Sequence, residues 1–131
     1  MLKAVTTNKL DEVVSLIEGG FPPDRSIDKK YGYNALQLAA LTNHFPLIEL
    51  LIIRGAAVNI RDQYGNTPLH LAVKQENREA IHSLLRHGAD PSLQNNYGVT
   101  PIDKARSSSI KDFMRQFQRK QNIFPAFTVR L

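Results

Sequence analysis

The chain has 131 residues, a formal net charge of +5, 42% hydrophobic residues and 22% charged residues. This composition is that of one globular domain, and the absence of cysteine excludes disulfides and thiolate metal sites. No apolar run approaches the roughly 20 residues of a membrane-spanning helix, and no targeting address is readable at the N-terminus. We therefore expect an intracellular, cytoplasmic protein, with association with an organelle or a large complex left open.

The sequence repeats itself at a fixed period. Residues 31–63 align with residues 64–96 without a gap, and a further copy opens with YGVTPIDKA at residue 97. Residues 4–20 match the helical part of the same unit. A constant period of this length is typical of a stacked repeat protein. We expect four units, at about 1–30, 31–63, 64–96 and 97–120, and an extended C-terminal tail at 121–131.

Each unit is predicted to contain two short helices. The dipeptide Thr-Pro at residues 67 and 100 predicts the start of an inner helix, because threonine caps a helix and proline fits its first turn. Asn43 lies where the chain must reverse between the two helices, and asparagine tolerates the left-handed conformation that a sharp stop needs. Glu76 and Asn77 occupy this place less cleanly in the next unit.

The outer helices are predicted from apolar residues spaced at i, i+3 and i+4, which would bury one stripe of each helix. A glycine at position 20, 55 or 88 follows each helix as a C-terminal stop. The stripes comprise Val13, Leu16 and Ile17; Ile48, Leu51 and Ile52; and Ile81, Leu84 and Leu85. The middle helix carries four further apolar residues, which are Phe45, Leu47, Leu50 and Ile53. Neighbouring units, a partner or the C-terminal tail would have to cover them.

The segments GNTPLHLA and LLRHGADPS, at this period, resemble the ankyrin repeat, and the resemblance covers residues 1 to about 120. It implies an all-α solenoid of stacked helix pairs with β-hairpin fingers. A polar residue at each end would cap the stack. Lys3 and Lys104 stand where the middle units carry Leu38 and Leu71, so the first and last units are expected to be caps.

An enzyme or a metal site is not expected. All seven glycines are explained by helix stops and turns, which leaves none for a phosphate-binding loop. His70, near Thr67 and Asp62, is the most catalytic-looking residue, but the resemblance implies hydrogen bonds within and between fingers for it. His82 and His87 would point to different faces of their helix, which disfavours a metal pair. We expect no cofactor. A catalytic or metal site at His70 is kept as a hypothesis beside the two binding functions described below.

The resemblance implies a non-catalytic protein-interaction module, an adaptor or scaffold, that binds through its fingertips and inner-helix face. The residues so implied are Tyr31, Tyr33, Arg61, Gln63, Tyr64, Asn66, Gln94, Asn96 and Tyr97 on the fingers, and Lys74, Gln75 and Arg106 on the inner helices. Tyr31, Tyr64 and Tyr97 recur at the repeat period. Such a ladder would either contact a partner, as interface tyrosines often do, or brace one finger against the next.

The positive charge is concentrated in the last quarter of the chain. Residues 1–102 hold ten basic and ten acidic residues, whereas residues 103–131 hold seven and two. Residues 109–120 predict a capping helix with Ile110, Phe113, Met114 and Phe117 on one side and basic residues on the other. The basic face is either solvated or binds an acidic protein surface or a membrane surface. Nucleic acid is not expected, because no aromatic residues are interleaved with the charges.

The tail carries Phe124, Phe127, Val129 and Leu131 in the segment IFPAFTVRL. Burying its apolar side chains would gain about 8 to 15 kcal/mol, and ordering the segment would cost roughly 9 to 18 kcal/mol. Because these nearly cancel, we expect the tail to be ordered only by a partner. The alternative to an adaptor is therefore a fixed structural subunit of a large assembly, anchored by the basic cap and this tail.

Overall fold

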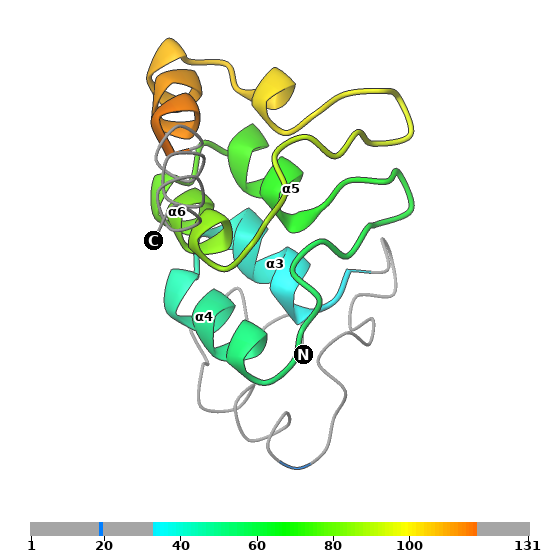
Figure 1. The fold of residues 1–131 in the computed structure, drawn as a ribbon. Coiled ribbons are helices and arrows are strands. Elements are labelled where there is room, and N and C mark those ends of the chain that lie inside the picture. The colour runs from blue at the N-terminus through cyan, green and yellow to red at the C-terminus, as the bar shows by residue number, and fades with distance from the viewer. Residues whose placement is uncertain (1–18, 20–32, 118–131) are drawn as a thin grey trace, which may run out of the picture.

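The computed structural model describes residue 19 and residues 33–117. Its labelled elements are α3 (Ala35–Thr42), α4 (Phe45–Ile53), α5 (Pro68–Lys74), α6 (Arg78–Arg86) and the 3-10 helix η1 (Ile102–Lys104). Residues 108–117 are also helical. Figure 1 shows α3, α5 and η1 as an inner column, with α4, α6 and helix 108–117 as an outer column beside it. Most of the predicted first unit and the tail lie outside the described residues.

The inner helices α3 and α5 begin with the same pair of reciprocal hydrogen bonds. In α5 the backbone N–H of Thr67 donates to Nδ1 of His70 (3.1 Å), and the N–H of His70 donates to Thr67 Oγ1 (3.4 Å). In α3 the same bonds join Asn34 and Gln37 at 2.8 and 2.9 Å. Two otherwise unpaired N–H groups are satisfied at each helix start. The predicted Thr-Pro start of α5 is thus confirmed.

The last inner helix is shorter than its Thr-Pro start predicts. Only Ile102–Lys104 is helical, as a 3-10 turn, because Ala105 is already extended. Helix 108–117 begins before the position equivalent to the start of α6, which is residue 111. Ser107 fixes this early start: its hydroxyl accepts the N–H of Ile110 (3.3 Å), and its own N–H donates to Glu76 (2.9 Å). The outer helix of the last unit therefore starts three residues earlier than its equivalent in the preceding unit.

The reversals between inner and outer helices use left-handed backbone, as expected. Asn43 has φ of 60° and ends α3. Glu76, at the equivalent place one unit later, has φ of 54° although glutamate rarely adopts this conformation. The backbone conformation at residue 76 therefore follows its position in the repeat, and not the preference of glutamate.

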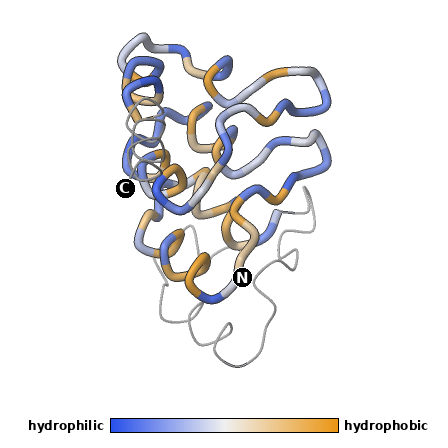
Figure 2. The backbone as a smooth tube through the Cα atoms, in the orientation of Figure 1, coloured by the Kyte–Doolittle hydropathy of each residue, from blue (hydrophilic) through white to orange (hydrophobic). Residues whose placement is uncertain are grey.

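The core is built from the predicted stripes. α3 packs against α5, and α4 packs against α6. Figure 2 shows the hydrophobic positions concentrated in the helices, while the projecting fingers are mostly hydrophilic. Leu38 and Leu71 are buried, whereas Lys104 at the equivalent position is half-buried. The stripe residues that are fully buried are Ile48, Leu51, Ile81 and Leu84.

The extra apolar residues of α4 divide into two groups. Leu47 is buried and Leu50 is half-buried against the core. Phe45 and Ile53 remain 42% and 72% exposed. Neighbouring elements thus cover only one side of this helix in the described part of the chain.

Candidate partner-binding face

Two fingers project from the inner helices, and we name them finger A (residues 56–67) and finger B (residues 89–100). Each tip is a turn organised by one side chain. Asp62 Oδ1 accepts the backbone N–H groups of Tyr64 and Asn66 at 2.9 Å each. Asn95 Oδ1, at the equivalent position of finger B, does the same at 2.9 and 3.0 Å. Neither finger contains a β-strand, so the hairpins of the fold are tight turns here.

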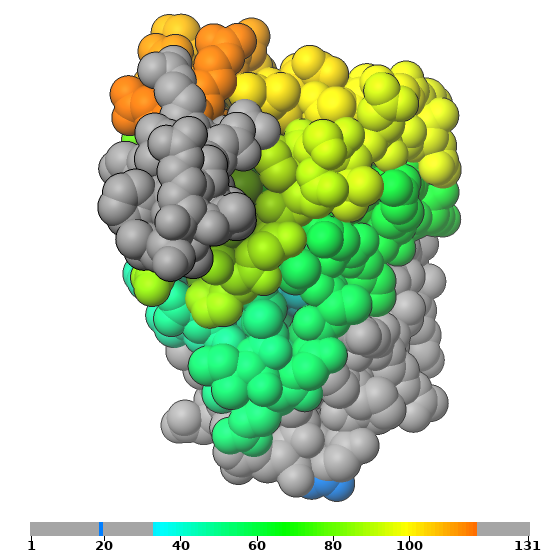
Figure 3. Space-filling view, viewed as in Figure 1, coloured from blue at the N-terminus to red at the C-terminus, as the bar shows by residue number. Residues whose placement is uncertain are grey.

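The fingertips are joined by hydrogen bonds that run from one finger to the next. Asn96 donates its backbone N–H to the Tyr64 carbonyl (2.9 Å) and its side-chain amide to the Gln63 carbonyl (3.1 Å). Arg61 donates to the Gln94 carbonyl at 2.8 Å. Figure 3 shows the two fingers, green and yellow, in contact along the edge of the molecule. Three backbone carbonyls thus accept hydrogen bonds from the neighbouring finger. These bonds hold the two fingertips in a fixed position relative to each other.

Asn66 and Gly65 add to this junction. The Asn66 side-chain oxygen accepts a hydrogen bond from Asn95 Nδ2 at 2.9 Å. Gly65 has φ of 79°, and a Cβ placed there would lie 2.7 Å from the Asn96 backbone nitrogen. Gly98, the equivalent in finger B, has φ of 76° but open space around it. Glycine is therefore required at residue 65 both for the turn and for the close approach of finger B.

His70 connects α5 to finger B. Its side chain is fully buried, and its Nε2 lies 2.7 Å from the Val99 carbonyl oxygen. Because the Thr67 N–H donates to Nδ1, that nitrogen carries no proton and Nε2–H is the donor to Val99. Both ring nitrogens are used in holding the structure. The expectation that His70 bonds within and between fingers agrees with this geometry.

The pKa of His70 is lowered from its ordinary value of 6.5. Burial is the largest cause, because the charged imidazolium would lose water. The Val99 carbonyl and Asp62 act in the opposite direction, while Lys104 and Arg61 lower the pKa further. The neutral ring is therefore the form that this position favours.

The predicted tyrosine ladder is only partly a row of exposed rings. Tyr97 is 74% exposed and Tyr64 is 43% exposed, so both offer apolar area to solvent. Tyr33 is half-buried and packs against the core. Tyr31 lies outside the described residues.

The remaining predicted residues form a second group at the other end of α5. Lys74 and Gln75 are exposed at the C-terminal end of this helix. The Arg106 guanidinium donates to the Lys74 carbonyl at 3.0 Å and so lies beside them. The length of α5 separates this group from the fingertips. Phe124, Phe127, Val129 and Leu131, predicted in the tail, lie outside the described residues.

Two asparagines join neighbouring units at the helix turns, and this role was not predicted from the sequence. Asn77 donates to the carbonyls of Ala40 (2.9 Å) and Leu41 (3.1 Å), near the C-terminal end of α3. Asn43 accepts the N–H of Ala80 in the first turn of α6 at 3.1 Å. The repeat period marked position 43 as a turn, but only the stacking of the units shows what its side chain reaches.

Within residue 19 and residues 33–117, no three His, Cys, Asp or Glu side chains are grouped so that they would hold a metal ion. No helix in these residues has the length and apolar character needed to cross a membrane.

Comparison with known proteins identifies the fold. A family model described as ankyrin repeats in three copies matches residues 1–95 and 43–118. The crystal structure of the ankyrin repeat domain of Bcl-3, described as a unique member of the IkappaB protein family, is 34% identical with a TM-score of 0.78. The match covers 87% of this chain and 50% of that one, so this chain spans half of its length. In total, 484 solved chains match, and likeness of fold alone therefore selects no partner. No curated protein sequence matches. The chain belongs to the ankyrin-repeat family, and its fold is the predicted all-α solenoid.

Proposed function

We propose that the chain is a non-catalytic adaptor or scaffold that binds a protein partner through the tips of fingers A and B. Ankyrin repeats generally mediate protein–protein interaction. The observation that carries the proposal is that hydrogen bonds join the fingertips to each other while Tyr97 stays 74% exposed. A surface that is ordered before binding loses little entropy on binding, and tyrosine contributes a large contact area with few rotatable bonds.

The group formed by Lys74, Gln75 and Arg106 at the C-terminal end of α5 supports a contribution from charge. Lys74 and Arg106 are both exposed and basic, the Arg106 guanidinium donates to the backbone carbonyl of Lys74, and the exposed Gln75 follows Lys74 in the chain. A partner with acidic residues would be attracted to this group, and the attraction would weaken as salt is added. We propose that it steers the partner, while the fingertips provide most of the contact area.

The chemistry of His70 supports the non-catalytic part of the proposal. Its side chain is buried, and each ring nitrogen already has a hydrogen-bond partner. A general base needs a nitrogen within hydrogen-bond reach of a substrate proton. His70 offers none while the fold is intact.

The test is affinity purification with the full chain as bait, beside the double variant Tyr64→Ser, Tyr97→Ser. The matched control is Ile53→Ser, which changes a side chain of similar exposure (72%) on α4, away from the fingers. We expect specific partners to be lost from the double variant and kept by the control. Retention of every partner by the double variant would refute binding through the fingertips.

The alternative of a fixed structural subunit depends on the tail, together with the basic helix that leads to it. A bait ending at Gln121 tests it, since partners that only this shorter chain loses belong to the tail. If the bait ending at Gln121 keeps every partner of the full chain, the structural-subunit alternative is refuted and only the adaptor proposal remains. The cytoplasmic location stays a prediction.

A further inference from the structure

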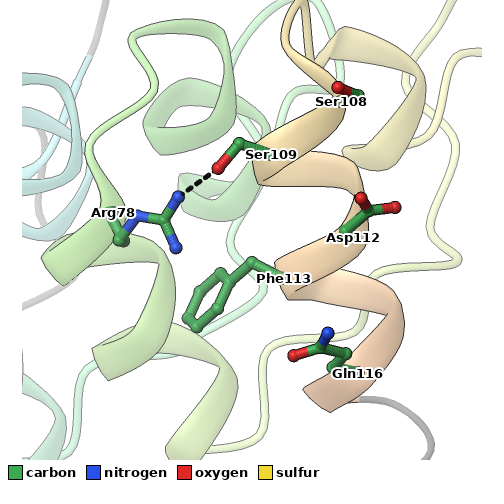
Figure 4. A pocket seen from close by; sticks show the side chains of 6 residues that line it. All are labelled: Arg78, Ser108, Ser109, Asp112, Phe113 and Gln116. Carbon is green, nitrogen blue, oxygen red and sulfur yellow. Dashed lines mark hydrogen bonds between the residues drawn. The ribbon is translucent and has the colours of Figure 1, made fainter.

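A cavity of about 470 Å³, broadly open to solvent, lies on the outer face between α6 and helix 108–117. Figure 4 shows Arg78 reaching from α6 toward Ser109 at the other side of this cavity. Their Nη2 and Oγ atoms are 2.6 Å apart. The Arg78 guanidinium carbon also lies 5.1 Å from the centre of the Phe113 ring, a cation–π distance. A cation from one unit is therefore already held against a serine hydroxyl of the next.

The serine is accessible and is preceded by basic residues. Ser109 is exposed, and its neighbour Ser108 is exposed beside it. Arg106 stands three positions before Ser109, and Lys104 stands five before. Kinases select substrates by such charge patterns, because acidic residues around their active sites attract basic side chains near the serine.

We propose that Ser109 is a phosphorylation site whose phosphate is bound by Arg78. A serine/threonine kinase with Mg-ATP transfers the γ-phosphoryl group to Ser109 Oγ. The new bond joins this oxygen to phosphorus, and the bond from phosphorus to the β–γ bridging oxygen breaks, so ADP leaves. The hydroxyl proton passes to the carboxylate base of the kinase.

The charges around Ser109 determine what the modification does. A phosphoserine carries about −1.5 to −2 charges and offers three strong acceptor oxygens. Arg78 lies at hydrogen-bond distance from the oxygen that would carry the phosphate, and the wide cavity has room for the group. Asp112 lines the same cavity and opposes the phosphate, but this carboxylate lies 3.8 Å from Arg115. The net effect is a stronger link between α6 and helix 108–117.

Ser109 must enter a kinase active site, and its position permits this. It lies in the first turn of helix 108–117, after the non-helical residues 105–107. Helix ends open locally at a much smaller free-energy cost than global unfolding. Opening this turn releases Ser109 from Arg78, and closing it afterwards places the phosphate against the guanidinium.

The first experiment treats the full chain with Mg-ATP and a purified serine kinase whose substrates carry arginine three positions before the serine. Mass spectrometry locates the phosphate. We expect it at Ser109, with no incorporation into Ser109→Ala and full incorporation into Ser108→Ala. An unmodified chain, or phosphate at Ser107 or Ser108 instead, would overturn the proposal.

The second experiment measures the capture itself by hydrogen exchange of residues 108–117. We expect phosphorylation to slow exchange by about tenfold, since an anionic phosphate replaces the neutral hydroxyl as the acceptor of the Arg78 guanidinium. Arg78→Gln should still be phosphorylated but should lose this slowing. Equal slowing in Arg78→Gln, or faster exchange on phosphorylation, contradicts a role for Arg78. Neither result depends on the fingertips, so the proposal stands or falls apart from the adaptor function.

Discussion

The Nε2–H of His70 donates a 2.7 Å hydrogen bond to the backbone carbonyl of Val99, in the next finger along the chain. This bond passes from the start of α5 to the base of finger B. It requires the neutral ring, because Nδ1 accepts the N–H of Thr67 at the same time. A titratable group thus lies at the junction between the third and last units.

The first prediction follows from this junction and concerns pH. The folded pKa of His70 is below 6.5, so the unfolded chain binds the proton more readily than the folded chain. Stability is therefore complete above about pH 6.5 and is lost as the pH falls toward the folded pKa. We expect a lower urea midpoint at pH 5.5 than at pH 7.5.

His70→Gln is the matched variant for this measurement. Gln37 already fills the equivalent place in the preceding unit, where its side chain accepts the N–H of Asn34 at 2.8 Å. We expect His70→Gln to cost about 1 kcal/mol at pH 7.5 and to reduce the loss of stability between pH 7.5 and 5.5. An unchanged pH dependence in the variant would assign the effect to another group.

The second prediction separates the two finger glycines. Gly98→Ala should cost about 1 to 2 kcal/mol, because alanine is strained at positive φ. Gly65→Ala should cost about 1 to 3 kcal/mol more, since its Cβ also meets the Asn96 backbone and overpacking forces the fingers apart. Urea denaturation of both variants checks the difference. Equal losses would show that finger B does not press on Gly65.

The third prediction concerns the helix turns. Asn77→Ala removes the donor that satisfies the Ala40 and Leu41 carbonyls, so we expect a loss of about 1 to 2 kcal/mol in the free energy of unfolding. Gln75→Ala, an exposed change nearby, should stay within about 0.5 kcal/mol. If both variants match the wild-type urea midpoint, the Asn77 bridge does not contribute to stability.

The fourth prediction concerns the exposed rings. Tyr97→Ser should change the free energy of unfolding by less than about 0.5 kcal/mol, because the side chain is 74% exposed. A loss above about 1.5 kcal/mol, measured by thermal and urea unfolding, would mean that Tyr97 braces the fingers. In that case the ring would be a structural residue and not a contact surface.

The repeat period predicted most of the fold because equivalent positions in successive units adopt the same backbone conformation. It placed a left-handed residue at position 76 as well as at position 43, even though glutamate is a poor choice there. It also placed Lys104 where Leu38 and Leu71 are buried. The period alone would start the last outer helix at residue 111, but the apolar pattern of residues 109–120 predicted it from residue 109, close to the observed start at 108. Neither pattern indicated that Glu76 of the preceding unit accepts the N–H of Ser107 just before this helix.

The candidate site was harder to predict than the fold. The resemblance to ankyrin repeats implied that Arg61 and Asn96 lie at the fingertips, but it did not indicate that both donate hydrogen bonds to backbone carbonyls of the neighbouring finger. The resemblance also implied that Arg106 lies on an inner helix, whereas it follows the short helix η1 and is not itself helical. Hydrogen bonds between units depend on how the repeats stack. The sequence of a single repeat does not indicate which residues of the next repeat its side chains will contact.

The most direct test of the account places a photo-crosslinking amino acid at position 97 or at position 53 of the full chain, in the cell that produces it. Both side chains are similarly exposed, but only position 97 is on a fingertip. We predict a discrete crosslinked protein from position 97, suppressed by excess unmodified chain, and none from position 53. Crosslinks from position 53 alone, or identical products from both positions, would contradict binding through the fingers.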